Sequence, residues 1–235
     1  MISGLQKMTL LDYPGKVACT VFLQGCNFRC PFCHNSDLLG KDAPQTISTE
    51  ELMTFLKKRV GLLDAVCITG GEPTLQKDLP ELIRQIKALG YLVKLDTNGS
   101  RPAVLKQLAE EKLIDYVAMD IKNSPSRYGQ TVGLSNMDLK ALEESIRYLL
   151  EHHVDYEFRT TVADELHNAQ DMQEMGQWLC GLVPGTKPIR HYIQPYVDRE
   201  SVLTQGLHTP EKEKLLDMAE KLAPYADFVE IRGMD

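Results

Sequence analysis

Three closely spaced cysteines constrain this chain more than any other feature. Cys26, Cys30 and Cys33 come directly after the apolar run 17–23. Such a run is typical of a buried strand, so the cysteines are expected on the loop at its carboxyl end. Thiolates are the usual ligands of iron–sulfur clusters, and an all-protein [4Fe-4S] site takes four of them. Three cysteines would leave one iron open to a small molecule, which predicts a reactive cluster.

Structural zinc is the alternative interpretation of the same cysteines. His34, or one of the distant cysteines Cys19, Cys67 and Cys180, would then complete the site. Closed zinc sites normally draw on two separated ligand pairs, and the sequence has no second C-x-x-C or H-x-x-H pair. The spacing therefore favours the cluster. The three distant cysteines lie in apolar surroundings and are expected in the core.

Composition excludes several other classes of function. The formal net charge is −7 at pH 7, and no tract of Lys and Arg could neutralise the roughly 6–10 phosphates of a nucleic-acid contact. No apolar run approaches the ~20 residues of a membrane helix, and the first residues lack the basic and apolar regions of a signal peptide. We therefore expect a cytoplasmic protein that binds neither nucleic acid nor membranes.

Strand and helix patterns alternate along the chain. Apolar runs predict strands at 17–23, 65–69, 91–95, 116–121, 156–162, 191–194 and 228–231. Helices are predicted at 48–60, 79–89, 102–111, 168–182 and 210–223, and around the repeat Leu139, Leu142, Ile146 and Leu149. This alternation implies a parallel sheet with right-handed crossovers. The expected fold is one α/β domain over residues 1–235, a partial TIM-like (β/α)6 barrel. It would have a curved parallel sheet and outer helices, after an irregular lead-in at 1–16.

Polar or glycine-rich groups follow several predicted strands, at the end where parallel barrels carry their reactive groups. Beyond the cysteine loop these groups are Gly70-Gly71-Glu72-Pro73, Asp96-Thr97-Asn98-Gly99, Asp120-Ile121-Lys122 and Pro195-Tyr196. Adjacent glycines let the backbone approach a ligand closely, and Glu72 offers an acceptor to a cation. An ordinary turn is the structural alternative at this position.

Charged residues at the ends of the predicted strands need partners. Asp96 and Asp120 end neighbouring strands, so their carboxylates should repel each other unless a cation lies between them. Lys122 could neutralise the pair or contact a cofactor carboxylate, and a surface salt bridge is the structural alternative. Arg159 interrupts an apolar strand and therefore needs a carboxylate partner, from a cofactor or from an aspartate.

The C-x-x-x-C-x-x-C spacing, with Phe32 before the last cysteine, resembles the signature of the radical SAM enzymes. Similarity extends along nearly the whole chain to the glycyl-radical-enzyme activases, which include the activator of pyruvate formate-lyase. Leu11-Asp12-Tyr13-Pro14-Gly15-Lys16 followed by Gly25-Cys26-Asn27-Phe28-Arg29-Cys30 looks most like the branch that activates anaerobic ribonucleoside-triphosphate reductase. The resemblance implies a [4Fe-4S] cluster on Cys26, Cys30 and Cys33, with S-adenosylmethionine chelating the open iron.

The resemblance also implies roles for residues around that cofactor. The glycine-rich stretch would bind its amino group, and Phe32 with the backbone near His34 would contact its adenine. A monovalent cation would lie by Asp96, Thr97, Asp120 and the Ala118 carbonyl. The implied cofactor-binding residues are Phe32, His34, Gly70, Gly71, Glu72, Asp96, Thr97, Asp120, Lys122 and Arg159.

Two positions depart from the pattern of the pyruvate formate-lyase activase. Val197 follows Pro195-Tyr196 where that activase has a histidine, so its ribose-side contact is not carried over. The turn Asp12-Tyr13-Pro14-Gly15 with Lys16 replaces Asp-Gly-Pro-Gly with arginine. Since that turn borders the substrate peptide in the relative, the second change affects recognition of the partner.

The implied reaction is reductive cleavage of S-adenosylmethionine, followed by abstraction of hydrogen from the glycine Cα of a large partner enzyme. The electron donor would be flavodoxin or ferredoxin, because the step needs the low end of the roughly −700 to +450 mV span of such clusters. No protein acid, base or nucleophile is needed for it. Two alternatives stay open: a radical SAM enzyme that acts on a small molecule, and a metal-stabilised binding or electron-transfer protein without cofactor cleavage.

Overall fold

The computed structural model describes residues 2–40, 46–135, 137–151 and 153–233. Within these ranges the chain divides into two units. The first holds residues 2–27 and 37–118 with the short segment His153–Asp155, and the second holds Phe28–Ser36, 119–151 and 156–233. The cysteine loop therefore passes from the first unit to the second between Asn27 and Phe28.

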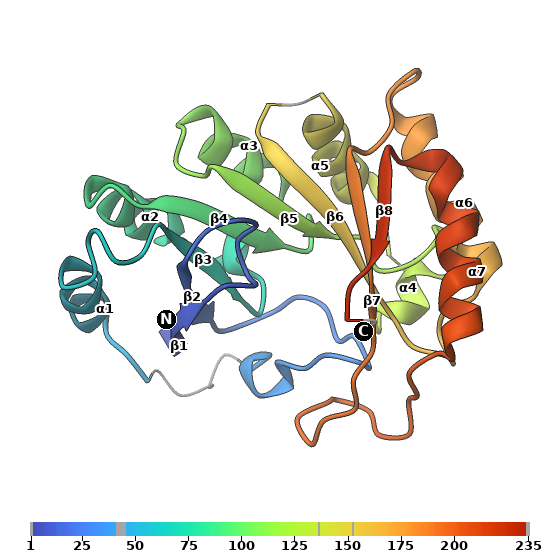
Figure 1. Cartoon of the computed structure of the whole chain (residues 1–235), viewed down its shortest axis with the longest axis horizontal. Helices are drawn as coiled ribbons and strands as arrows, with labels where there is room; N and C mark the ends of the chain where they lie inside the picture. Colours follow the sequence, from blue (N-terminus) through green and yellow to red (C-terminus); the bar gives the residue numbers. More distant parts are fainter. Residues whose placement is uncertain (1, 41–45, 136, 152, 234–235) are drawn as a thin grey trace. The chain divides into compact units, whose positions relative to one another are not determined.

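Strands and helices alternate from the second strand onward (Figure 1), and strand order follows the sequence from β1 to β8. The described residues contain the six expected strand–helix pairs: β2 (Ala18–Leu23) and α1 (Thr49–Lys57), β3 (Ala65–Gly70) and α2 (Leu79–Ala88), β4 (Leu92–Thr97) and α3 (Pro102–Glu110), β5 (Tyr116–Asp120) and α5 (Lys140–Leu150), β6 (Asp155–Val162) and α6 (Ala169–Leu182), β7 (Arg190–Pro195) and α7 (Lys212–Leu222). Strand β8 (Phe228–Ile231) follows them. Short helices η1 (Ser36–Leu38), η2 (Pro73–Leu75), α4 (Tyr128–Thr131) and η3 (Ala223–Tyr225) lie in the connections.

The amino-terminal segment differs from the prediction. Residues 1–16 are expected to be irregular, but Ile2–Thr9 forms strand β1, antiparallel to β2, with Ile2 opposite Leu23 and Thr9 opposite Ala18. The middle of β1 is polar and partly exposed, so the sequence shows no apolar period there. Backbone hydrogen bonds to β2 hold the strand instead. The sheet is therefore mostly parallel, with an antiparallel strand at its edge.

An apolar layer closes the amino end of the strands in the first unit. The register places Ala18, Ala65 and Leu92 side by side on β2, β3 and β4. Tyr13 packs on this layer, and its ring lies 5.6 Å from the ring of Tyr116. The turn 12–15 and the cysteine loop thus lie at opposite ends of β2, because the turn precedes the strand and the loop follows it.

The cysteines outside the loop largely match their predicted place in the core. Cys19 and Cys67 are fully buried, and burial raises the pKa of each thiol to about 12. Cys180, on α6, is only partly buried, and its thiol lies 3.4 Å from the Tyr225 carbonyl oxygen. Burial also raises the pKa of Cys180. Protonated thiols of this kind act as small apolar side chains rather than as metal ligands.

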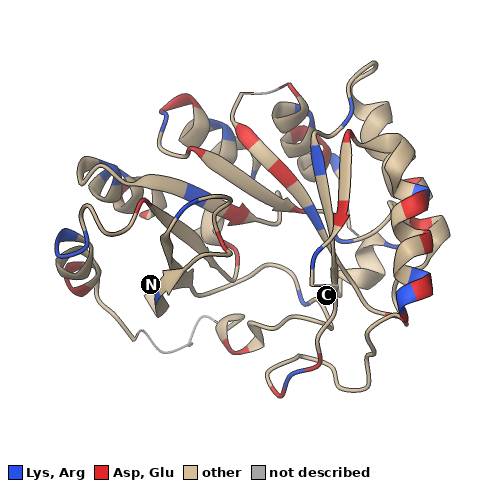
Figure 2. Cartoon of the chain, in the orientation of Figure 1, with Lys and Arg blue, Asp and Glu red and all other residues tan. Residues whose placement is uncertain are grey.

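Paired charges connect the last strands of the second unit. Strand β6 carries Glu157 and Arg159, and Figure 2 shows both acidic and basic colours along it. Glu157 is buried, and its two carboxylate oxygens accept from the Arg232 guanidinium at 3.0 and 2.9 Å. The same guanidinium lies 3.4 Å from the ring centroid of Tyr192 on β7. A bidentate pair with a stacked ring satisfies a carboxylate that would otherwise be costly to bury.

No helix within the described ranges is both long enough and apolar enough to cross a membrane.

His191 on β7 predicts a dependence of stability on pH. Its side chain is fully buried, and burial lowers its pKa from 6.5 to about 3. The unfolded chain therefore takes up the proton first, so the stabilisation is complete above pH 6.5 and is lost as pH falls toward 3. The expected loss approaches about 1.4 kcal/mol per pH unit. Urea unfolding of the reduced protein measures the free energy of unfolding between pH 4 and 8. This free energy should depend less on pH in His191→Phe than in the wild type.

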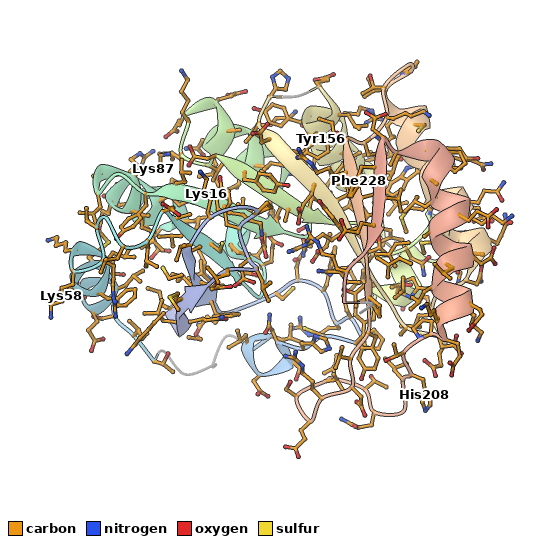
Figure 3. The ribbon with its side chains drawn as sticks, viewed as in Figure 1. Lys16, Lys58, Lys87, Tyr156, His208 and Phe228 are labelled. Atoms are coloured by element: carbon orange, nitrogen blue, oxygen red, sulfur yellow. The ribbon has the colours of Figure 1, made fainter. Side chains whose placement is uncertain are left out.

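The control for this experiment is His208, labelled in Figure 3, which is exposed and pairs with Glu165. The hydrogen bond that His208 donates to the Glu165 carboxylate raises the pKa of His208, so this histidine stabilises the fold at low pH instead. His208→Gln should therefore change the pH profile in the opposite direction. If the free energy of unfolding of His191→Phe depended on pH as in the wild type, this role of buried His191 would be contradicted.

Candidate functional site

The glycine pair after β3 packs against the start of the cysteine loop. Gly70 has a φ of +113°, and a Cβ there would lie 2.3 Å from the Leu23 carbonyl oxygen. A Cβ on Gly71 would lie 2.1 Å from the Gly25 carbonyl oxygen. The backbone amides of Gly71 and Glu72 donate to these same two carbonyls, at 2.8 and 2.7 Å. The close approach that glycine permits is therefore made here by the protein's own backbone.

Glu72 is buried between two loops of the first unit. Only 1% of the residue is exposed, and its carboxylate accepts from the amide and hydroxyl of Thr74, the Thr97 hydroxyl and the Asn98 amide. Burial raises the pKa of Glu72, and these hydrogen bonds oppose the rise. The carboxylate thereby joins the loop after β3 to the loop after β4. Its role as a cofactor contact stays a prediction.

Asp96 has a cationic partner on its own strand. The Nζ atom of Lys94 donates to Asp96 Oδ1, and Lys94 is almost completely buried. Lys94 lies in a row with Thr20 and Cys67 across three strands, and the Thr20 hydroxyl donates to Asp12. All three side chains of this row are buried, and Cys67 also belongs to the apolar layer that Tyr13 covers. Lys94 therefore already compensates the charge that Asp96 brings.

Cys26 lies next to two asparagine side chains. Asn98 Nδ2 is 4.0 Å from Cys26 Sγ and donates to Asn27 Oδ1 at 2.9 Å. Asn98 Oδ1 accepts from the Ser100 amide at 3.0 Å, and Asn27 Nδ2 donates to the Ser100 hydroxyl at 2.9 Å. Asn98 is 6% exposed. The loop after β4 thus contacts the first cysteine directly.

Cys30 and Cys33 lie on one turn of the second unit. The amide of Cys33 donates to the Cys30 carbonyl at 3.1 Å, and the amide of Arg29 donates to the Val132 carbonyl at 2.9 Å. Cys30 is 6% exposed, whereas Cys33 is intermediate. Burial raises the pKa of the Cys33 thiol, and the positive charges of Lys122 and Arg29 oppose the rise. The backbone of this segment is therefore held by contacts within its own unit.

Phe32 and the charges around Asp120 form one group in the second unit. Lys122 Nζ lies 5.8 Å from the Phe32 ring centroid, and the His167 ring meets Phe32 edge-on at 6.0 Å. Lys122 Nζ is 2.8 Å from Asp120 Oδ2, and Arg159 Nε is 3.1 Å from Asp120 Oδ1. Burial alone would raise the pKa of Asp120, but the two cations lower it. The expected carboxylate partner of Arg159 is thus confirmed as Asp120.

His34 uses its side chain to hold the loop after β7. Its Nε2 atom lies 2.7 Å from the Val197 carbonyl oxygen, and its ring stacks on Tyr196 with 5.7 Å between centroids. The Ser201 hydroxyl donates to the His34 carbonyl at 3.0 Å. Val197, which stands where the pyruvate formate-lyase activase has a histidine, therefore contributes its backbone to this contact. The contact between the backbone near His34 and the adenine of the cofactor stays a prediction.

The predicted site residues divide between the two units. The first holds Cys26, Gly70, Gly71, Glu72, Asp96 and Thr97, and the second holds Cys30, Phe32, Cys33, His34, Asp120, Lys122 and Arg159. Asp96 and Asp120 each have a cationic partner within their own unit, and a shared monovalent cation stays a prediction. In the described ranges no three His, Cys, Asp or Glu side chains are grouped as ligands of a single metal ion.

The contacts of several residues in the site were not predicted from the sequence. Lys94 lies inside an apolar strand, and its register with Thr20 and Cys67 is a property of the sheet. His167 holds Lys122 from outside the predicted loops, because its Nε2 atom lies 2.8 Å from the Lys122 carbonyl oxygen. The contact of Asn98 with a cysteine could have been predicted from sequence, since Asn98 belongs to the polar group after β4 and an amide can donate to sulfur.

Comparison with known proteins decides the family. The model of the radical SAM superfamily matches residues 20–179, a span that contains the cysteine loop and both polar loops of the first unit. The chain belongs to the radical SAM superfamily. It is therefore a radical SAM enzyme, and the family implies a [4Fe-4S] cluster and S-adenosylmethionine.

Radical SAM relatives match at full and at partial length. A Methanocaldococcus jannaschii protein named for glycyl-radical enzyme activation is 31% identical over 244 residues, which cover 100% of this chain and 97% of the relative. The pyruvate formate-lyase-activating enzyme of Clostridium pasteurianum is 32% identical over 127 residues, 52% of this chain and 52% of that enzyme.

The fold of this chain is also found among solved structures. The crystal structure of Streptococcus suis SuiB aligns with a TM-score of 0.69 at 16% identity over 91% of this chain, which spans 48% of SuiB. A sequence identity this low supports a shared fold and nothing further. The expected α/β class with a mostly parallel sheet is confirmed, with β1 as its antiparallel strand.

Gly71→Ala is expected to lower the free energy of unfolding by roughly 2–4 kcal/mol. Its new Cβ would lie 2.1 Å from a carbonyl oxygen of the cysteine loop. Gly181→Ala is the matched control, because nothing lies within 4 Å of a Cβ at that helical position. It should stabilise the protein by about 0.5–1 kcal/mol. Anaerobic urea denaturation measures both, and a Gly71→Ala protein as stable as the wild type would refute the close packing.

Proposed function

We propose that this enzyme activates a glycyl radical enzyme. In this proposal Cys26, Cys30 and Cys33 hold a [4Fe-4S] cluster, and S-adenosylmethionine binds the remaining iron. The single observation that carries it is the relative named for glycyl-radical enzyme activation, which matches over the whole of this chain. Anaerobic ribonucleotide reductase is the proposed partner, on the resemblance of the 11–16 and 25–30 stretches, with flavodoxin or ferredoxin as the electron donor.

The donor set fits the cluster. All three side chains are soft thiolate donors, which iron–sulfur clusters require. Backbone hydrogen bonds hold the chain on both sides of Cys26: the Gly25 amide donates to the Leu38 carbonyl at 2.6 Å, and the Arg29 amide donates to the Val132 carbonyl. Bound together, the cluster and S-adenosylmethionine would supply one-electron cleavage and hydrogen abstraction from a glycine Cα.

Charge supports a cofactor role for the group around Asp120. Lys122 and Arg159 share this one carboxylate, so the three side chains carry one more positive than negative charge. Asp120 raises the pKa of Lys122 against the effect of burial, which keeps the ammonium charged. An excess positive charge suits the carboxylate of S-adenosylmethionine. Phe32 and His167 would keep this ammonium in place, because one faces it and the other binds the carbonyl of its residue.

The first test is cofactor cleavage by the isolated enzyme. Anaerobically reconstituted protein with dithionite and S-adenosylmethionine should form 5'-deoxyadenosine. Cys30→Ala should lose both the cluster and this product, since two cysteines cannot hold the cluster. Cys180→Ala is the matched control and should keep both. Absence of 5'-deoxyadenosine from the wild type would refute the proposal.

The second test concerns the partner. Anaerobic ribonucleotide reductase from the same genome, made with α-deuterated glycine, should transfer deuterium into 5'-deoxyadenosine. The organic radical on the reductase should show a smaller hydrogen splitting by electron paramagnetic resonance than with ordinary glycine. Cofactor cleavage without deuterium transfer would exclude this partner. It would leave the chemistry of the cluster as proposed.

A further inference from the structure

Asn98 is held so firmly that the direction of its side-chain amide is determined. Its backbone amide donates to Glu72 Oε2 at 2.6 Å, and its side-chain Oδ1 accepts from the Ser100 amide. One hydrogen of Nδ2 is used by Asn27 Oδ1 at 2.9 Å. These contacts set the orientation of the amide, because oxygen and nitrogen each meet a partner of the required kind.

Asn98 Nδ2 also lies within hydrogen-bonding range of the Cys26 sulfur. The nitrogen lies 4.0 Å from Cys26 Sγ. Asn98 is 6% exposed, so water has little access to this donor. An amide with one hydrogen already bound to a fixed acceptor presents the other at a fixed angle.

Glu72 anchors this arrangement from the other side. Its carboxylate accepts from the Thr97 hydroxyl and the Asn98 amide, so it holds two consecutive residues of the loop after β4. The Glu72 amide donates to the Gly25 carbonyl, next to Cys26 in sequence. The cysteine and its donor are therefore tied to the same residue. Because Glu72 holds one end through its carboxylate and the other through its backbone amide, it keeps their separation small without touching the sulfur.

We propose that Asn98 is a positioning residue that donates an N–H···S hydrogen bond to Cys26 and raises the reduction potential of the cluster. Sulfur ligands become more negative when a cluster accepts an electron, so a donor stabilises the reduced form more than the oxidised form. This inference rests on the proposed function, because it requires the cluster on Cys26. It adds a residue that determines how readily the cluster is reduced.

Redox titration of the reconstituted protein tests the proposal. Asn98→Ala should lower the equilibrium constant for one-electron reduction about tenfold, which is about 59 mV. Asn98→Asp, which keeps the shape and the acceptor for Ser100, should lower it further because it adds a negative charge. Gln107→Ala is the matched control: it removes another side-chain amide of the first unit, one that lies on α3 and donates to Glu111 instead. Its potential should equal that of the wild type.

A measurement on the wild type avoids dependence on the variants. Pulsed electron paramagnetic resonance of the reduced cluster, with asparagine labelled by ¹⁵N in its side chain, should show a nitrogen coupling. Asn98→Ala should lose that coupling, and Gln107→Ala should keep it. Equal potentials in wild type and both Asn98 variants, or no coupling in the wild type, would overturn the role of Asn98 alone. A wild type that takes up no cluster would overturn this inference and the proposed function together.

Discussion

The structure of the first unit depends on a buried carboxylate placed beside a glycine pair. Glu72 accepts four hydrogen bonds from Thr74, Thr97 and Asn98, and the glycines before it lie against the backbone of the cysteine loop. Burying a carboxylate is costly unless donors surround it, and here the donors are the neighbouring loops themselves. The need to satisfy Glu72 therefore holds three loops together at the carboxyl ends of β2, β3 and β4.

In the second unit, cationic side chains compensate the charge of a carboxylate. Lys122 and Arg159 both pair with Asp120 on and beside β5 and β6, which leaves an excess of one positive charge. The His34 side chain also holds the cysteine segment, because it contacts the Val197 carbonyl and the Tyr196 ring in the loop after β7. A rigid backbone around the cysteines is what a cluster with an open iron needs, since its remaining position must stay free for the cofactor.

The regular elements and the chemistry could largely be predicted from sequence. Buried parallel strands are continuous apolar runs, which is why the predicted strands agree with β2 to β8 within a few residues. The cysteine spacing pointed to a cluster because its ligands come from one short segment. Strand β1 was missed because its polar residues show no period, and only pairing with β2 makes it a strand. The pairing of Arg159 with Asp120 was expected in kind, because a buried guanidinium requires a carboxylate.

By itself, the sequence determined the family signature, the alternation of strands and helices, and the loops that carry polar groups. These are local properties, because residues close in the chain produce them. The tertiary structure alone decided what each side chain contacts: Lys94 compensates Asp96, Glu72 holds Asn98, and Asn98 lies within hydrogen-bonding range of Cys26. Register and loop packing bring together residues 72 positions apart in the case of Asn98 and Cys26. No local pattern in the chain encodes a contact of that kind.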